Sequence, residues 1–246
     1  LRRFNWSIFL LVAALLAFGC LALLSLSLGG EEAFLKFNRQ LIYIGFLIPL
    51  IFVISAFNYR GFIALTPFLI FISLGLLVGV LFFGQIVHGS RGWFVLGGLN
   101  FQPVELAKIV LILALAHFFY LKGKASLSWP NFVLSAGYTA LFVTPVLWQP
   151  DFGSAMILVG IWGVFIIFTA SRWQIFSLGL TALAGSVLVW FFWFQAYQRE
   201  RIMTFLFPGL DPSGSSYNVH QAILAISTGG LWGQGLGKGP VTSLRY

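Results

Sequence analysis

The chain has 246 residues, of which 59% are hydrophobic and only 8% are charged, with a formal net charge of +8. A soluble domain carries about 25% charged residues, so this composition excludes a water-soluble globular protein. An excess of Lys and Arg in so apolar a chain fits anionic lipid headgroups and membrane topology rather than nucleic acid. We therefore predict an integral membrane protein that contacts membrane lipids. The single cysteine, Cys20, excludes a disulfide within the chain.

Seven segments are long and apolar enough to cross a membrane, for which a helix needs roughly 20 mostly apolar residues. Helix is the expected conformation, because an open sheet cannot satisfy its edge groups in lipid. We predict an all-α fold, with a polytopic helix bundle in residues 1–194 and a large extracytoplasmic loop with short helices in residues 195–246. The predicted spans are residues 8–28, 41–57, 61–83, 104–121, 132–148, 152–170 and 175–194.

The cations of the short loops predict the orientation, since Lys and Arg favour the cytoplasmic side. A cytoplasmic N-terminus places six of these cations inside (Arg2, Arg3, Arg60, Lys122, Lys124 and Arg172) and three outside (Lys36, Arg39 and Arg91). The last segment, residues 195–246, adds four more cations outside, which weakens this difference. Residues 29–40, 84–103 and 195–246 then lie outside the cytoplasm. The first apolar segment is too long for a cleavable signal, so we expect a retained anchor. We also expect the chain to be incomplete, because it starts at Leu1 and ends inside a loop.

Two polar positions interrupt the apolar helices. Glu105 and Lys108 are three residues apart and share one helix face. They form either a self-neutralising pair beneath the headgroups or the lining of a groove for a charged substrate. Asp151 follows Gln149 and Pro150 and opens the next helix. It serves either as the helix N-cap or as part of a polar, outward-facing cavity.

The outer segments hold the remaining candidates. Arg91 lies near Trp93, and together they are typical of an anchor in the lipid headgroups. Asp211 begins the sequence Asp-Pro-Ser-Gly, which is typical of a turn. Residues 217–228 place apolar side chains on one helical face, which predicts a helix lying in the membrane interface. The glycine-rich residues 229–239 lack the spacing of a phosphate-binding loop, and the three histidines do not have metal-ligand spacing.

Three motifs carry a resemblance to a known family. They are GSRGWFVLGGLNFQPVELAKI at residues 89–109, QPDFGSA at residues 149–155 and RIMTFLFPGLDPSGSSYNVHQAILAISTGGLWGQGLGKG at residues 201–239. In this order they resemble the SEDS family (shape, elongation, division and sporulation), which contains RodA, FtsW and SpoVE. The chain is more similar to RodA than to FtsW at residues 3–6 and 217–219.

The resemblance implies a peptidoglycan glycosyltransferase that polymerises lipid II at the outer face of the bacterial cytoplasmic membrane. It also implies a partner, a class B penicillin-binding protein with transpeptidase activity. By motif match, the essential acid of the family falls on Asp211. Family members usually have ten spans, whereas this chain would end just before the eighth. We therefore expect about the last third of the full protein to be missing from the chain. Other family-typical polar residues fall on Arg91, Gln102, Glu105, Lys108, Gln149 and Asp151. All of these except Gln102 are expected to bind or position the substrate.

This chemistry suits the residue types. We expect Asp211 to act as the base that takes a proton from the attacking sugar hydroxyl, with inversion at the anomeric carbon. The departing diphosphate requires cations, for which Arg199, Arg201, Lys238 and Arg91 are candidates, and a divalent Mg or Mn ion could share the task. Two alternatives remain open: a flippase or transporter for lipid-linked precursors, and a scaffold of the cell-wall synthesis complex without catalytic activity.

Overall fold

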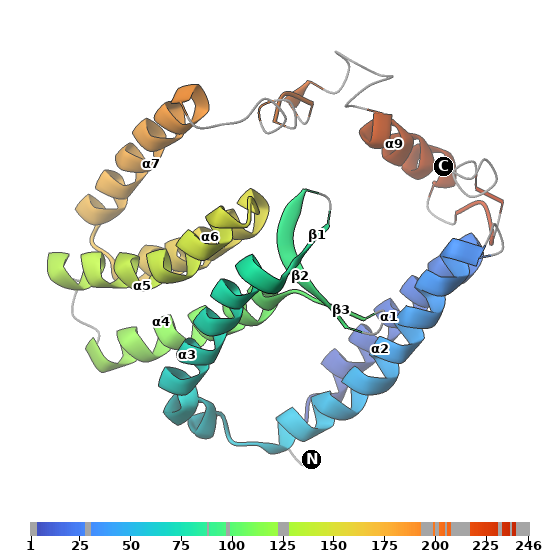
Figure 1. Ribbon diagram of the computed structural model, residues 1–246, viewed down its shortest axis with the longest axis horizontal. Coiled ribbons are helices and arrows are strands. Elements are labelled where there is room, and N and C mark those ends of the chain that lie inside the picture. Colours follow the sequence, from blue (N-terminus) through green and yellow to red (C-terminus); the bar gives the residue numbers. More distant parts are fainter. Residues whose placement is uncertain are drawn as a thin grey trace. The chain divides into compact units, whose positions relative to one another are not determined.

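Helices make up most of the described structure, as predicted, and one helix covers most of each of the seven predicted spans (Figure 1). The computed structural model describes residues 4–27, 31–87, 89–96, 99–122, 128–192, 199, 202–204, 206–207, 217–230, 233–236 and 238–239. The helices are α1 (Trp6–Ser27), α2 (Glu31–Ala56), α3 (Tyr59–Phe83), α4 (Pro103–Lys122), α5 (Trp129–Trp148), α6 (Phe152–Thr169), α7 (Arg172–Phe192) and α9 (Tyr217–Gly229).

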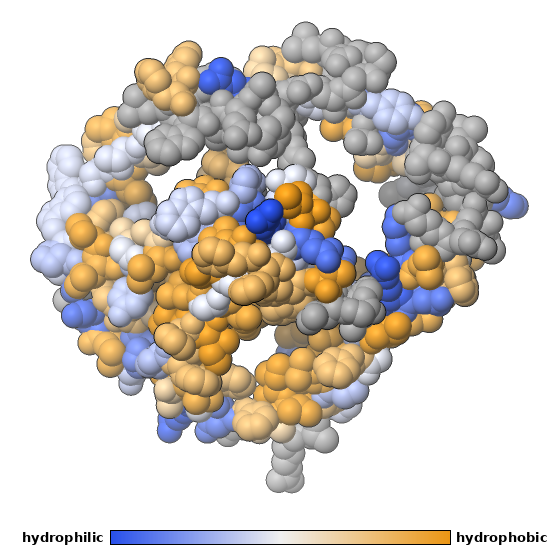
Figure 2. All heavy atoms as spheres, in the orientation of Figure 1, coloured by the Kyte–Doolittle hydropathy of each residue, from blue (hydrophilic) through white to orange (hydrophobic). Residues whose placement is uncertain are grey.

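Six of the described helices, α1 to α6, are long and apolar enough to cross a membrane. The protein is a multi-pass helical membrane protein. On the face seen in Figure 2, hydrophobic residues cover much of the described helical surface. Phe46, Phe71 and Phe168 on three of these helices are each more than three-quarters exposed on the surface of the protein. Lipid tails cover such side chains in a membrane, so their exposure is what a spanning helix requires.

The chain divides into two compact units. One is Phe57–Leu183, and the other combines Leu1–Ala56 with Ala184–Tyr246, so that α7 begins in the first and ends in the second. In the second unit α1 and α2 pack on one another, and an aromatic cluster forms where Phe4, Trp6 and Phe9 meet Phe52. The predicted division of the chain at residue 194 stays a prediction.

The core of Phe57–Leu183 lies between α3, α4, α5 and α6. An indole N–H of Trp162 on α6 donates to the Ser135 hydroxyl on α5 at 3.0 Å, so this buried polar contact links two helices. The fully buried apolar side chains of the core include Leu77, Leu111, Leu115, Phe142, Val146, Leu158 and Ile166. These four helices therefore form a packed platform for the segments at their ends.

Between α3 and α4 the structure contains a small antiparallel sheet, where the sequence predicts a loop without strands. Its order is β1 (Gln85–Val87), β2 (Ser90–Leu96) and β3 (Leu99–Phe101). Gly89 has φ +84°, so the turn between β1 and β2 needs a residue without a side chain. β1 and β3 escape prediction because three residues are too few to show an alternating pattern.

Helix ends follow local capping rules. The Asn58 side chain accepts from the Arg60 amide at the start of α3, and Ser171 and Gln174 form a reciprocal capping box at the start of α7. The largest difference from the predicted boundaries is at the start of α2. Residues 29–40 were expected to be an outer loop, but α2 begins at Glu31, because its charged residues are good helix formers and the helix extends past its apolar stretch.

Candidate functional site

Polar residues from four helix ends and the sheet meet at one end of the α3–α6 platform. This region, here called the polar joint, contains the C-terminal ends of α3 and α5 and the N-terminal ends of α4 and α6. The connected residues are Ser90, Arg91, Gly92, Gln102, Gln149, Asp151 and Ser154. Hydrogen bonds across the joint bring together residues that are 49 to 72 positions apart in sequence.

Gln149 lies at the centre of the polar joint and is 1% exposed. Its side-chain amide donates to the Leu77 carbonyl of α3 at 3.0 Å. Its own main-chain carbonyl accepts from the Arg91 amide at 3.2 Å and the Ser90 hydroxyl at 2.9 Å. Gly92 is buried beneath it, and a Cβ there would lie 3.3 Å from Gln149 Oε1. Gln149 therefore fixes the first residues of β2 against α3 and α5.

Asp151 caps α6, which is one of the two roles predicted from the sequence. Its Oδ1 accepts from the Ser154 amide at 3.0 Å, and its Oδ2 accepts from the Ser154 hydroxyl at 2.7 Å. The same Oδ2 also accepts from Gln102 Nε2 at 3.2 Å. Since Gln102 directly precedes α4, the Asp151 carboxylate joins the starts of two helices.

Glu105 and Lys108 form an ion pair on the first turns of α4. Lys108 Nζ lies 2.7 Å from both carboxylate oxygens of Glu105. The Lys108 side chain is 19% exposed, whereas that of Glu105 is 59% exposed. Glu105 also stands in the first turn of α4, where a negative charge complements the helix dipole. The pair is self-neutralising, and its Glu105 side faces out of the packed core.

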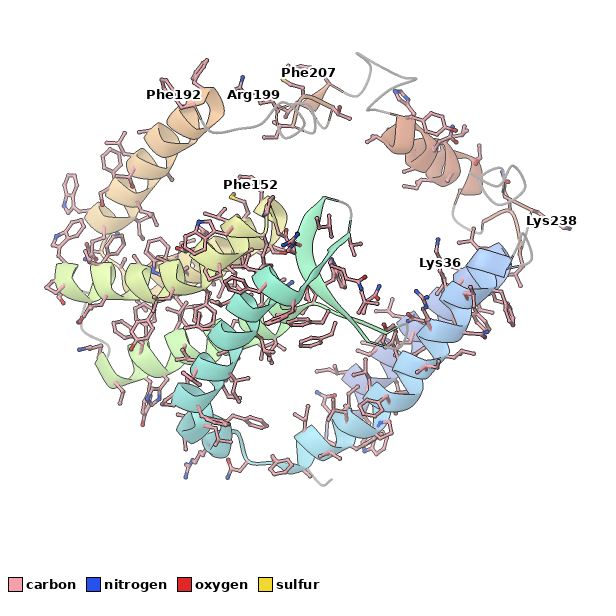
Figure 3. The ribbon with its side chains drawn as sticks, viewed as in Figure 1. Lys36, Phe152, Phe192, Arg199, Phe207 and Lys238 are labelled. Carbon is pink, nitrogen blue, oxygen red and sulfur yellow. The ribbon has the colours of Figure 1, made fainter. Side chains whose placement is uncertain are left out.

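Two of the predicted substrate-binding cations donate to the last turns of helices. Arg91 Nη1 donates to the Leu81 carbonyl at 3.3 Å, two residues before the end of α3. Arg199, labelled in Figure 3 with Phe192, donates through Nη2 to the Phe191 carbonyl at 3.1 Å, at the end of α7. Carbonyls in a last helical turn have no partner within the helix and carry partial negative charge, which a guanidinium complements.

The remaining candidates lie in the last segment. The Lys238 side chain is exposed, and its amide donates to the Gly235 carbonyl at 3.4 Å. The helix predicted at residues 217–228 is α9, which ends at Gly229 and is followed by Gly230 with φ +55°. Arg201 and Asp211 lie outside the described residues. Of the predicted site residues, Arg91, Gln149 and Asp151 therefore lie together in the polar joint. Glu105 and Lys108 lie on α4, which begins directly after Gln102.

Metal ligation finds little support in the described part of the chain. There, no three His, Cys, Asp or Glu side chains gather as a metal site would require. Mg and Mn prefer carboxylate oxygens, but the Asp151 carboxylate already accepts from Ser154 and Gln102, and that of Glu105 pairs with Lys108. These two carboxylates of the described residues therefore do not fit a divalent ion, and a Mg or Mn ion that shares the stabilisation of the diphosphate stays a prediction.

Sequence reasoning missed Ser90, Gly92 and Ser154 as members of the polar joint. Ser154 had a readable signal, because a serine three residues after an N-cap aspartate can return a hydrogen bond to it. Ser90 had none, since its partner is 59 residues away. Gly92 had none either, because the side chains that a Cβ there would meet, Gln149 at 3.3 Å and Ser90 at 3.4 Å, are brought to it by the fold.

Comparisons with known proteins agree with the motifs. Residues 5–246 match the cell cycle protein family of FtsW, RodA and SpoVE. The chain is 31% identical over 242 residues to the peptidoglycan glycosyltransferase MrdB of Escherichia coli strain K12, and this match covers 96% of the chain and 63% of the relative. It is 32% identical over 215 residues to the stage V sporulation protein E of Bacillus subtilis, with 85% of the chain and 57% of the relative covered.

Solved structures agree with these matches. A chain from a study of how a peptidoglycan synthase complex coordinates polymerisation and crosslinking superposes with a TM-score of 0.72 at 36% identity, covering 93% of this chain and 67% of that one. The crystal structure of the rod shape determining protein RodA of Thermus thermophilus gives a TM-score of 0.61 at 34% identity, covering 74% and 59%. By the match over residues 5–246 and the shared helical fold, the chain belongs to the SEDS family of FtsW, RodA and SpoVE.

Proposed function

We propose that this protein is a peptidoglycan glycosyltransferase that polymerises lipid II at the outer face of the bacterial cytoplasmic membrane. The observation that carries this proposal is the polar joint, a hydrogen-bonded site at one end of otherwise apolar helices. The E. coli relative is named a peptidoglycan glycosyltransferase. Because the chain spans 63% of that relative's length, the activity is proposed for the native protein as a whole.

The position of the polar joint suits a lipid-linked sugar. Such a substrate keeps its hydrocarbon tail in the bilayer and its sugars in water, so reacting groups must lie where spanning helices meet an outer loop. The joint lies at such a boundary: α3 and α5 end there, and α4 and α6 start there. A cytoplasmic N-terminus would place this end of the four helices outside, which is the orientation we infer from the loop cations.

The chemistry assigned to the residues follows from their types. Asp211 would remove the proton from the sugar hydroxyl that attacks the anomeric carbon, with inversion there and departure of the lipid diphosphate. Developing charge on the diphosphate would be stabilised by guanidinium and ammonium groups. Glu105 and Lys108 would position the substrate from the first turns of α4. The candidate cations for the diphosphate are Arg91, Arg199, Arg201 and Lys238.

A transporter for lipid-linked precursors is less well supported. A translocation path needs polar or ionisable groups along the depth of the membrane. In the described platform, the buried polar side chains away from the joint include the hydroxyls of Thr66, Ser73, Ser135 and Thr139, which carry no charge. The ion pair instead lies on the first turns of α4, close to the polar joint.

We also infer a transpeptidase partner, a class B penicillin-binding protein. The support is the solved chain that this protein resembles, whose study describes coordinated polymerisation and crosslinking in one complex. Polymerised glycan must be crosslinked to form a wall, so an enzyme that only polymerises requires a crosslinking activity nearby. A scaffold without catalytic activity would require the same partner but not Asp211.

The test replaces Asp211 by Asn in the native protein reconstituted with lipid II. Loss of a general base slows a reaction by roughly 100-fold to 10,000-fold, so polymer formation should fall by at least the lower figure while membrane insertion is unchanged. Glu200→Gln, which removes another acid of the same segment, is the matched control and should retain activity. Polymerisation that survives Asp211→Asn would contradict the assignment. Translocation of lipid II without polymerisation by the unaltered protein would favour the transporter.

A further inference from the structure

We propose that Asp151 is a positioning residue, which acts through Gln102 to fix the first turn of α4 and with it the Glu105–Lys108 pair. The consequence for turnover rests on the proposed function, because it assumes that this pair positions the lipid-linked substrate. The structural part of the inference does not rest on it. It starts from the carboxylate of Asp151, which bridges two helix starts separated by 49 residues of chain.

The Asp151 carboxylate is already engaged by this chain's own donors. It accepts the Ser154 amide, the Ser154 hydroxyl and Gln102 Nε2, at 3.0, 2.7 and 3.2 Å. A carboxylate offers about four acceptor positions, so three internal donors leave little capacity for a sugar hydroxyl. Asp151 is also partly buried. These contacts favour a role in holding the protein over direct contact with substrate.

Gln102 passes this restraint on to α4. Its main-chain carbonyl accepts from the Glu105 amide at 3.1 Å, which is the first bond of the helix, while its side chain is held by Asp151. Pro103 follows at the first helical position, where its fixed φ is compatible with the helix. Residues three apart are neighbours on a helix, so Gln102 neighbours Glu105 and Glu105 neighbours Lys108. A change in the Asp151–Gln102 contact therefore reaches the ion pair within two helical turns.

An exchange of the two functional groups separates positioning from direct contact. Asp151→Asn keeps an N-cap acceptor, since Asn caps helices as well as Asp. The Gln102 amide can then turn over and present its oxygen to the new amide. Gln102→Glu instead sets two carboxylates against each other. The double variant Q102E/D151N restores one carboxylate facing one amide, with their places exchanged.

Each variant is assayed in the native protein by steady-state polymerisation of lipid II and by hydrogen–deuterium exchange of residues 103–108. Gln102→Glu should lower kcat/KM by roughly 10-fold or more, which is the lower bound for losing a hydrogen bond to a charged group, mainly through a higher KM. In Gln102→Glu, the amide hydrogens within residues 103–108 should exchange faster than in the wild type. Both measurements should return to within about 3-fold of wild type in Q102E/D151N, as in Asp151→Asn alone.

Ser135→Ala is the matched control. It removes the hydroxyl that accepts from Trp162 in the platform, away from the polar joint, so it should lower thermal stability without changing KM or the exchange of residues 103–108. Activity that is lost in Asp151→Asn and not recovered in the double variant would mean that the charge at residue 151 acts on substrate, which overturns the proposal. Unchanged exchange in Gln102→Glu would also overturn it. A wild-type protein that polymerises nothing would refute the proposed function alone, because the exchange experiment still reports on the Asp151–Gln102 contact.

Discussion

The strongest prediction about the polar joint concerns replacement of Gln149 by Glu. The two side chains have nearly the same shape, but the Gln149 amide donates to the Leu77 carbonyl at 3.0 Å and is 1% exposed. A carboxylate at this site cannot donate, and it would face a carbonyl oxygen inside the protein. The carboxyl group must therefore be protonated to keep the hydrogen bond, because a buried carboxylate without a partner is more costly still.

The expected loss follows from the free energy of holding a carboxyl group neutral. A glutamate with an ordinary pKa of about 4.3 in the unfolded chain costs about 3.7 kcal/mol to keep protonated at pH 7, and about 1 kcal/mol at pH 5. The variant therefore loses stability as the pH rises above the pKa that the glutamate has in the unfolded chain, and it regains stability on acidification. With about 2–4 °C of midpoint shift per kcal/mol, Gln149→Glu should unfold about 7–15 °C below the wild type at pH 7 and about 2–4 °C below it at pH 5.

The assay is thermal unfolding in detergent at one heating rate, at pH 5 and pH 7. Gln234→Glu is the matched control, because Gln234 makes the same kind of bond to a main-chain carbonyl at 3.0 Å but is exposed. It should shift stability by no more than about 0.5 kcal/mol at either pH. Gln149→Leu should show a loss that does not depend on pH. A pH 7 midpoint equal to the wild type, or a deficit that does not shrink at pH 5, would refute the buried hydrogen bond.

Two further predictions concern neighbouring residues. Gly92→Ala should lower the unfolding midpoint by several degrees, since its Cβ would lie 3.3 Å from the Gln149 side chain, whereas Gly137→Ala, with nothing within 4 Å, should be neutral or stabilising in the same melting experiment. The exchange E105K/K108E should leave stability within about 1 kcal/mol, because a partly exposed ion pair contributes little. It should abolish lipid II polymerisation, and a polymerisation rate near wild type would show that the pair does not recognise substrate charge.

Hydropathy predicted most of the fold because a spanning helix leaves a strong, simple signal. An uncharged run of about 20 apolar residues is typical of a membrane span, so the ends of α3 and α6 were predicted to within two residues. The start of α2 at Glu31 was missed because charge marks the membrane boundary rather than the helix boundary. The strands around Arg91 were missed because two of the three contain three residues each.

The site could be predicted only where its contacts are local. Asp151 as the cap of α6 and the Glu105–Lys108 pair both follow from spacings of three residues. Gln149 could not be predicted in this way, because its side chain bonds to a residue 72 positions earlier in the chain. Nothing in the sequence around Gln149 distinguishes a buried link between helices from a group that meets substrate.

This difficulty has a physical origin in the membrane boundary itself. A helix that ends there leaves carbonyls or amides that must find partners, and the same boundary is where a lipid-linked substrate presents its polar head. Arg91 and Asp151 lie at that boundary and bind helix ends. A polar residue near a helix terminus can therefore serve either the helix or the substrate, and its hydrogen-bond partners decide between these two roles. By that criterion, the Glu105–Lys108 pair is the better candidate for substrate contact, since its two charges bond each other and Glu105 remains mostly exposed.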